Sequence, residues 1–297
     1  MLNLKTNLFQ LLVVFSLGVL ISCGGGQEKT EDESEAFDAA KESLKENIEG
    51  VMVNLPDPTD LPYLLQATGA DFNASLINSK DVADKYKSTF DKTALNLGIY
   101  AADIGYLSSY EQTQDALDYL QVAKQLSEHL GVVDAVDQVV MERFEENIDD
   151  RDSLNSIIDS AIDDVDQYLK SEERNKVAAL VTTGSFIEGL YVSTELVRTY
   201  PKDLLPDDAR NLILTPVIKI ILDQESSVAE LIKLIESLPE DDLTKQIKSD
   251  LVVLQNNYAD LNMEDQIKNN RADLMLSDKT LEEITATVNK MRSEIIQ

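Results

Sequence analysis

The sequence Thr93-Ala-Leu-Asn-Leu-Gly-Ile-Tyr-Ala-Ala-Asp-Ile-Gly-Tyr-Leu-Ser-Ser-Tyr110 decides the fold, because Asp103 is the only charged residue in it. A second stretch, residues 178–194, has Glu188 as its only charge. A helix that is apolar on nearly every side is buried among other helices. We therefore expect these two segments to be the central helices of a bundle.

The two stretches are also similar to each other. Asp103-Ile-Gly-Tyr-Leu-Ser-Ser109 aligns with Glu188-Gly-Leu-Tyr-Val-Ser-Thr194, an acid-x-x-Tyr pattern that returns 85 positions later. Each stretch also holds two glycines, which permit close approach of helix backbones: Gly98 and Gly105 in the first, Gly184 and Gly189 in the second. The match suggests an internal duplication, although helix packing alone also produces similar strings.

The rest of the chain has the same apolar period of about 3.6 almost everywhere, and no segment alternates convincingly with period two. A strand over residues 213–222 is the one alternative, since β-branched residues are frequent there, but Pro216 argues against a central strand. The sequence thus predicts an all-α bundle of about nine or ten helices around the two central ones. The expected helices span 38–52, 81–109, 111–130, 132–148, 153–169, 172–200, 206–223, 227–238, 243–261 and 280–295, with a loop over 262–277.

Leu20-Ile21-Ser22-Cys23 ends an apolar run over residues 8–21 that follows Lys5. The run is shorter than the about 20 residues that a bilayer span requires, but it suits the apolar core of a signal peptide. Aliphatic-x-small-Cys resembles a bacterial lipobox, which implies removal of residues 1–22 and diacylation of Cys23. The alternative is an ordinary secretory peptide. Against that alternative, Cys23 is the only cysteine, whereas disulfide-stabilised secreted proteins carry an even number.

Residues 23–37 read as a lipidated, flexible and acidic tether, because three glycines and a run of charges cannot bury enough apolar surface to fold. Residues 38–297 then form a single all-α domain. Gly24, rather than Asp, follows Cys23; by the sorting rule for Gram-negative lipoproteins this implies the outer membrane. The body would face the periplasm or the cell surface.

The formal net charge of −29 excludes several classes of partner. Hydrophobic residues make up 43% of the chain, so the acidity belongs to the surface of a folded protein. Such a surface repels phosphate backbones, which argues against nucleic-acid binding. It also repels anionic head groups, so we expect the membrane to be held only through the acyl chains on Cys23.

The two central carboxylates are the candidate site. A carboxylate in an apolar helix is costly unless it is paired or protonated, and burial raises its pKa. In one interpretation neighbouring hydroxyls or a Lys or Arg satisfy Asp103 and Glu188, which then serve packing only. In the other, these carboxylates converge with Tyr100, Tyr106 and Tyr191 on a pocket between the central helices. The packing interpretation is the simpler one, since structural networks perturb carboxylates as well.

Motifs for catalysis and for cofactors are absent from the sequence. His129 is the only histidine, and it lies at an expected helix C-terminus, where a cation interacts favourably with the helix dipole. Without a second histidine or a free cysteine, no zinc site or cysteine nucleophile is available. No nucleophile elbow, Walker loop or dinucleotide fingerprint is present. We therefore expect no catalytic residue, no metal and no cofactor.

Four strings of the sequence carry a family resemblance: Leu97-Gly-Ile-Tyr-Ala-Ala-Asp-Ile-Gly-Tyr106, Gln114-Asp-Ala-Leu-Asp-Tyr-Leu120, Leu130-Gly-Val132 and Gly184-Ser-Phe-Ile-Glu-Gly-Leu-Tyr191. They resemble a group of all-helical lipoproteins of Bacteroidota. In the last string the group is expected to have Trp where this chain has Phe186. The resemblance covers the chain from about Asp81 onward, and it implies the fold and the lipid anchor but no activity.

These features together predict an outer-membrane lipoprotein that acts as a non-enzymatic binding module for a small molecule or an envelope protein. One alternative is a structural envelope scaffold or interaction protein without a ligand. Another is a hydrolase or lyase that uses Asp103 and Glu188 as an acid/base pair. The enzyme alternative requires both carboxylates to lie within reach of one cleft.

Overall fold

The computed structural model describes residues 66, 71–131, 175–201, 206–259 and 279–297. These residues form helices and connecting loops and contain no strand, so the predicted all-α class is confirmed for the described part of the chain. In chain order the elements are the 3-10 helix η1 (Lys80–Ser88) and the α-helices α3 (Phe90–Ser109), α4 (Thr113–Leu130), α7 (Asn175–Thr199), α8 (Asp207–Leu222), α9 (Glu225–Glu236), α10 (Asp242–Ala259) and α13 (Lys279–Ile295).

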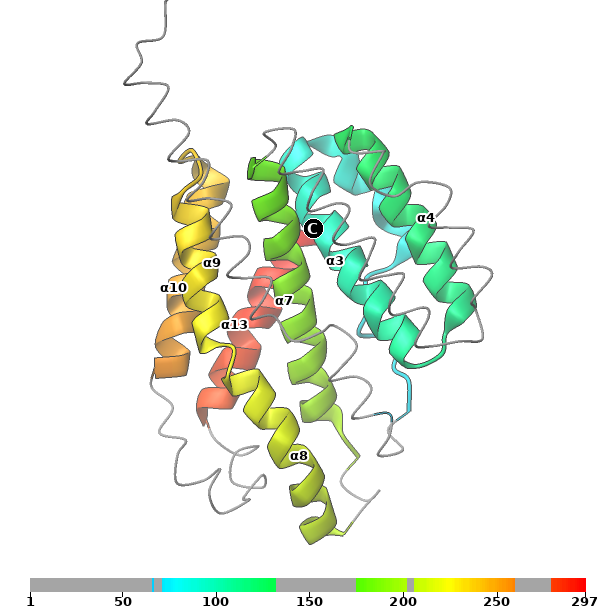
Figure 1. The fold of residues 1–297 in the computed structure, drawn as a ribbon, viewed down its shortest axis with the longest axis vertical. Coiled ribbons are helices and arrows are strands. Elements are labelled where there is room, and N and C mark those ends of the chain that lie inside the picture. The colour runs from blue at the N-terminus through cyan, green and yellow to red at the C-terminus, as the bar shows by residue number, and fades with distance from the viewer. Residues whose placement is uncertain (1–65, 67–70, 132–174, 202–205, 260–278) are drawn as a thin grey trace, which may run out of the picture.

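The helices α3 and α7 lie side by side at the centre and run in the same direction (Figure 1). On one side of this pair, α4 packs against α3, and η1 contacts both of them. On the other side, α9 and α10 pack against each other, and α13 lies between α10 and α7. Most residues of α3 and α7 are buried, which confirms the prediction that the two apolar segments are the central helices.

Two glycines bring the backbones of α3 and α7 into contact. A Cβ atom added to Gly98 would lie 2.0 Å from the carbonyl oxygen of Val181, and one added to Gly184 would lie 1.9 Å from that of Leu95. No side chain fits at either position. At Gly189 an added Cβ would meet nothing within 4 Å, so the predicted close approach is confirmed for Gly98 and Gly184 and is wrong for Gly189.

The two parallel helices are in register with the sequence repeat. Lys176 of α7 binds Asp91 of α3, 85 residues earlier, with 2.7 Å between Nζ and Oδ2. The same ammonium group lies 2.8 Å from Oδ2 of Asp241, just before α10. One lysine thus ties the beginnings of three helices together. Residues that correspond in the repeat lie at the same level of the bundle.

The helix predicted over 81–109 is wrong in one respect, because it is two elements. Thr89, between η1 and α3, is extended, with φ −144° and ψ 153°. Its hydroxyl group accepts a hydrogen bond from the backbone N–H of Lys92 at 3.2 Å and so caps the start of α3. The apolar spacing continues unchanged across this break, which is why periodicity alone joined the two helices.

Other helix ends agree with the sequence. Gly131 follows α4 in the left-handed conformation, with φ 70°, as its position after Leu130 predicts. Residues 207–222 form α8 with Pro216 inside it, so the strand alternative is wrong. The helices predicted over 38–52, 132–148 and 153–169, the loop over 262–277, Cys23 and the acidic tether lie outside the described residues.

Of the described helices, α7 alone is long and apolar enough to cross a membrane, with a mean hydropathy of 1.2. However, 78% of its most apolar window is buried inside the bundle. The apolar character of α7 is therefore explained by its contacts with other helices.

The close approach gives a matched pair of variants. In Gly98→Ala the new methyl group overlaps backbone atoms of α7, which cannot move aside like a side chain, so we expect a loss of about 3 kcal/mol or more in the free energy of unfolding. Gly189→Ala meets open space, and alanine favours the helix by about 1 kcal/mol over glycine. Urea unfolding followed by circular dichroism measures both. Equal destabilisation of the two variants would contradict the contact.

Candidate functional site

A buried ion pair connects α7 to the C-terminal helix α13. Glu188 is 0% exposed and accepts two hydrogen bonds from Arg292, at 2.6 Å from Nε to Oε2 and 2.8 Å from Nη2 to Oε1. A two-pronged contact between guanidinium and carboxylate is among the strongest hydrogen-bonded pairs in proteins. Burial raises the pKa of Glu188, and the hydrogen bonds and charge of Arg292 oppose that effect. The geometry assigns the negative charge of this site to Glu188.

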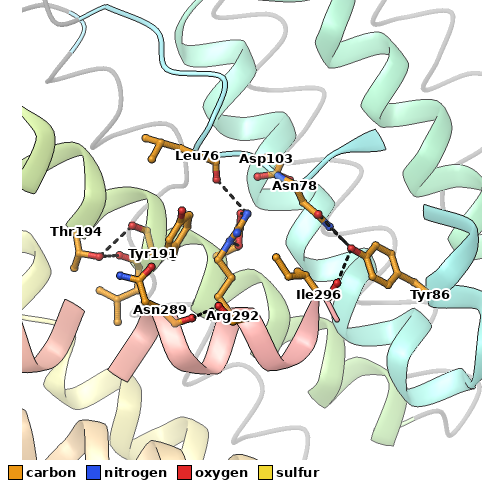
Figure 2. A network of polar contacts seen from close by, with 12 residues as sticks. Leu76, Asn78, Tyr86, Asp103, Tyr191, Thr194, Asn289, Arg292 and Ile296 are labelled. Carbon is orange, nitrogen blue, oxygen red and sulfur yellow. Dashed lines mark hydrogen bonds and ion pairs between the residues drawn. The ribbon is translucent and has the colours of Figure 1, made fainter. Parts of the chain in front are cut away.

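Arg292 makes two further contacts, and it is itself 8% exposed. Its Nη2 also donates to the carbonyl oxygen of Leu76 at 3.1 Å (Figure 2). Its guanidinium group lies 4.0 Å from the ring centre of Tyr191, which is the distance of a cation–π contact. Arg292 therefore joins α13, α7 and the segment before η1 in one cluster.

Asp103 of α3 completes the cluster, and it is also 0% exposed. Its Oδ2 accepts a hydrogen bond from the backbone N–H of Asn78 at 3.0 Å. Its other oxygen, Oδ1, has no hydrogen-bond partner among the described residues. Asp103 lies close enough to Glu188 for the two carboxyl groups to interact, and two ionised carboxylates repel each other. Because Glu188 is paired with Arg292, Asp103 is the member that favours the protonated form.

The pKa of Asp103 agrees with this assignment. Burial raises the pKa of Asp103 well above its ordinary value, and the nearby charge of Glu188 raises it further. Arg292 and the N–H of Asn78 act in the opposite direction but do not overcome burial. The direction of this shift favours a proton on Asp103, beside the ion pair of Glu188 and Arg292.

The tyrosine hydroxyls of the central region bind backbone atoms of residues 73–79, which we call the strap. Tyr100 donates to the carbonyl oxygen of Ser79 at 2.7 Å, and Tyr119 donates to that of Asn78 at 2.6 Å. Tyr106 accepts a hydrogen bond from the N–H of Asn73 at 3.0 Å. Burial raises the pKa of all three phenols, so they remain neutral hydrogen-bonding groups.

The structure separates the five predicted site residues into two groups. Asp103, Glu188 and Tyr191 meet around Arg292, whereas Tyr100 and Tyr106 turn their hydroxyls to the strap. That these residues line a ligand pocket stays a prediction.

Sequence reasoning missed Arg292, Tyr119 and the strap. For Arg292 a signal was present, because it lies four residues after Val288 and three before Ile295, on the buried face of α13. The strap has no periodic pattern, and no sequence signal marks it.

Metal binding finds no support in the described residues, which contain no group of three or more His, Cys, Asp and Glu side chains suited to an ion. His129 lies in the last turn of α4, as predicted, and its ring centre is 5.7 Å from that of Phe90. Comparison of the chain with protein-family models, with curated proteins and with solved structures gives no match. Functional conclusions therefore rest on the geometry of the chain itself.

Arg292→Met tests the buried ion pair. Methionine keeps much of the volume but leaves the Glu188 charge without its partner, so we expect the free energy of unfolding to fall by about 3–5 kcal/mol. The matched control is Lys219→Met, which removes an exposed pair with Asp223 that is worth about 1 kcal/mol or less. Chemical denaturation of both variants at neutral pH is the measurement. Similar losses would show that the buried pair has no special weight.

Asp103→Asn tests the shared proton. The amide group reproduces a protonated carboxyl group, since its oxygen accepts from Asn78 and its NH2 group donates to Glu188. We expect this variant to be at least as stable as the native chain at neutral pH. Glu188→Gln leaves the Arg292 charge uncompensated and is expected to cost about 3 kcal/mol or more.

The difference in free energy of unfolding between Asp103→Asn and the native chain should change with pH in one direction only. Asp103 binds its proton more tightly in the folded chain than in the unfolded chain, where the carboxyl pKa is about 3.9. Its stabilising contribution is therefore complete below that pH and is lost as pH rises through the raised folded pKa. The stability of Asp103→Asn relative to the native chain should rise from about pH 4 upward. A difference that falls with pH would contradict a protonated Asp103.

Proposed function

We propose that this protein is a lipoprotein of the outer membrane, anchored by acyl chains on Cys23. The support is the apolar run that ends in Leu20-Ile21-Ser22-Cys23, together with the absence of any other cysteine from the chain. Two or more acyl chains give stable anchoring, whereas one gives only marginal binding. The net charge of −29 keeps the body away from anionic lipids, so the acyl chains carry the attachment.

We further propose that the helical body is a non-enzymatic binding module. The observation that carries this proposal is the burial of the central carboxylates: Asp103 and Glu188 are 0% exposed, with the N–H of Asn78 bound to Asp103 and Arg292 bound to Glu188. An acid/base pair must reach a proton on a substrate, either directly or through a single water molecule. The buried arrangement therefore argues against the hydrolase or lyase alternative.

A protein partner fits the described residues better than a small molecule. The hydroxyls of Tyr100 and Tyr106, which the pocket hypothesis assigned to a ligand, are bonded to backbone atoms of the strap. The strap is itself polypeptide. A site built around backbone groups matches the chemistry of another polypeptide.

The scaffold alternative keeps one observation in its favour. Large apolar side chains are exposed on outer helices, with Leu212 of α8 66% exposed and Val253 of α10 46% exposed. Exposed apolar surface of sufficient size marks contacts with other proteins. These side chains are scattered, however, and single exposed apolar residues are common on protein surfaces.

The anchor is tested by growing cells with a radioactive fatty acid. The native chain should carry the label and sediment with membranes, and Cys23→Ala should lose both. Ser22→Ala is the matched control, because alanine keeps the aliphatic-x-small-Cys pattern and should leave the label in place. A native chain without label, or a labelled Cys23→Ala chain, would contradict the proposal.

The binding module is tested by native mass spectrometry of the full chain, extracted with detergent from the membranes of the cells that make it. We expect a polypeptide to stay bound to the native chain. We expect it to stay bound to Asp103→Asn as well, because the proposed binding does not use this carboxyl group as an acid or base. A chain that carries no bound mass would contradict the binding module and leave the scaffold alternative.

A further inference from the structure

The strap is held in an unusual way for part of a core. It has one backbone–backbone hydrogen bond within it, from Leu76 N–H to the carbonyl oxygen of Asn73 at 3.2 Å. Most of its other described backbone bonds go to side chains of α3, α4 and α13. The exceptions are the N–H of Ser75, which binds the Asn73 side chain, and the carbonyl oxygen of Ser79, which also accepts from the N–H of Val82. The side chains of α3, α4 and α13, together with Tyr86 of η1, form what we call the strap-binding cluster: Tyr86, Tyr100, Asp103, Tyr106, Tyr119 and Arg292.

Side chains that bind the backbone of an extended segment are also the arrangement by which proteins recognise peptides. Bonds to the main chain of a bound peptide supply affinity, and buried side chains at alternate positions supply specificity. In the strap, Leu76 is 3% exposed and Asn78 is 5% exposed, whereas Ala74 and Ser75 face solvent. The pattern is a Leu-x-Asn sequence in which Leu76 and Asn78 are buried and Ile77, between them, is half-buried.

Both polar atoms of the Asn78 side chain form hydrogen bonds with the hydroxyl group of Tyr86. Its Nδ2 donates to the hydroxyl oxygen of Tyr86 at 3.1 Å, and its Oδ1 accepts from that hydroxyl group at 3.2 Å (Figure 2). The backbone N–H of Asn78 binds Asp103, and its carbonyl oxygen binds Tyr119. Every polar group of this residue is therefore bonded, which is the arrangement expected for a specificity-determining position.

The strap can leave without dismantling what holds it. The two hydrogen bonds between Glu188 and Arg292 do not involve the strap, so this ion pair stays intact when Leu76 and Asn78 depart. The central helices are joined by their glycine contact and by Lys176. The strap is short and buries one apolar side chain fully, and such segments open at a lower free energy than the core.

We infer that the strap-binding cluster is a peptide-binding site, which the strap occupies as a resident ligand and which accepts in its place a partner segment containing Leu-x-Asn. This inference deepens the proposed function by giving the chemical class of the partner, and it rests on that function only for the physiological role. Peptide binding itself is independent of the lipid anchor.

The test uses a fluorescent peptide with the sequence of residues 71–79 and the full chain in detergent. In the native chain the strap competes with the peptide. Only the small fraction of chains in which the strap has left the site can bind, so the apparent affinity is the intrinsic affinity multiplied by that fraction. Leu76→Ala combined with Asn78→Ala weakens the strap and should tighten peptide binding by about tenfold or more. A folded double variant that binds the peptide no better than the native chain overturns the inference.

Two tyrosine variants locate the binding. In the double-variant background, Tyr119→Phe removes the bond to the Asn78 carbonyl oxygen and should weaken peptide binding by about tenfold. Tyr258→Phe is the matched control, because its buried hydroxyl donates to the carbonyl oxygen of Ile221 at 2.9 Å, away from the strap. It should leave the affinity unchanged. Equal effects of the two variants would overturn the site.

Hydrogen exchange of the unaltered chain gives a second, independent decision. The amide of Asn78 should exchange well before the amides in the middle of α3, because the strap opens locally. Exchange of Asn78 only together with α3 would overturn the inference even if a variant fails to fold. Cys23→Ala should bind the peptide like the native chain, so a failure of peptide binding and a failure of lipid attachment are distinguishable.

Discussion

The close approach of α3 and α7 is the constraint on which the rest of the structure depends. Gly98 and Gly184 allow each backbone to touch the other helix, and any side chain at either position would separate the pair. Because the helices run in parallel at this distance, Asp103 of α3 and Glu188 of α7 come close enough to interact. The glycine contact thus forces two buried carboxylates together, at a point where neither reaches water.

Two carboxylates in that position require both a proton and a cation. Burial raises the pKa of Asp103 and so favours its protonated form, and Arg292 of α13 provides the cation. Removal of one partner from a buried pair is costly, whereas a well-packed apolar replacement of the whole group is often neutral. The cluster therefore contributes less to stability than to specificity, since one position of α13 and one position of the strap satisfy Glu188, Asp103 and Arg292 together.

Sequence patterns predicted the parts of this structure that depend on local spacing. The two apolar stretches, the contact glycines Gly98 and Gly184 and the helix end at Gly131 follow from residue type and period. The break at Thr89 was hidden because the apolar period continues across it. The meeting of Glu188 with Arg292 was not predictable, since it joins residues 104 positions apart and depends on how α13 docks. The strap has no period, and only the positions of its partners reveal it.

Residues that correspond in the sequence repeat lie side by side in α3 and α7, but they contact different parts of the structure. Asp91 and Lys176 face each other 85 residues apart, and Asp103 and Glu188 do the same. Tyr106 and Tyr191 also correspond, yet the first binds the backbone of the strap and the second stacks on Arg292. If the two helices arose by duplication, the difference between them is what each one holds: α3 holds the strap through its tyrosines, and α7 holds α13 through its glutamate. A symmetric pair would satisfy its buried acids with two identical partners. Here one acid bonds to a segment that enters before η1 and the other to a segment near the end of the chain, so the central pair fixes the two in adjacent positions.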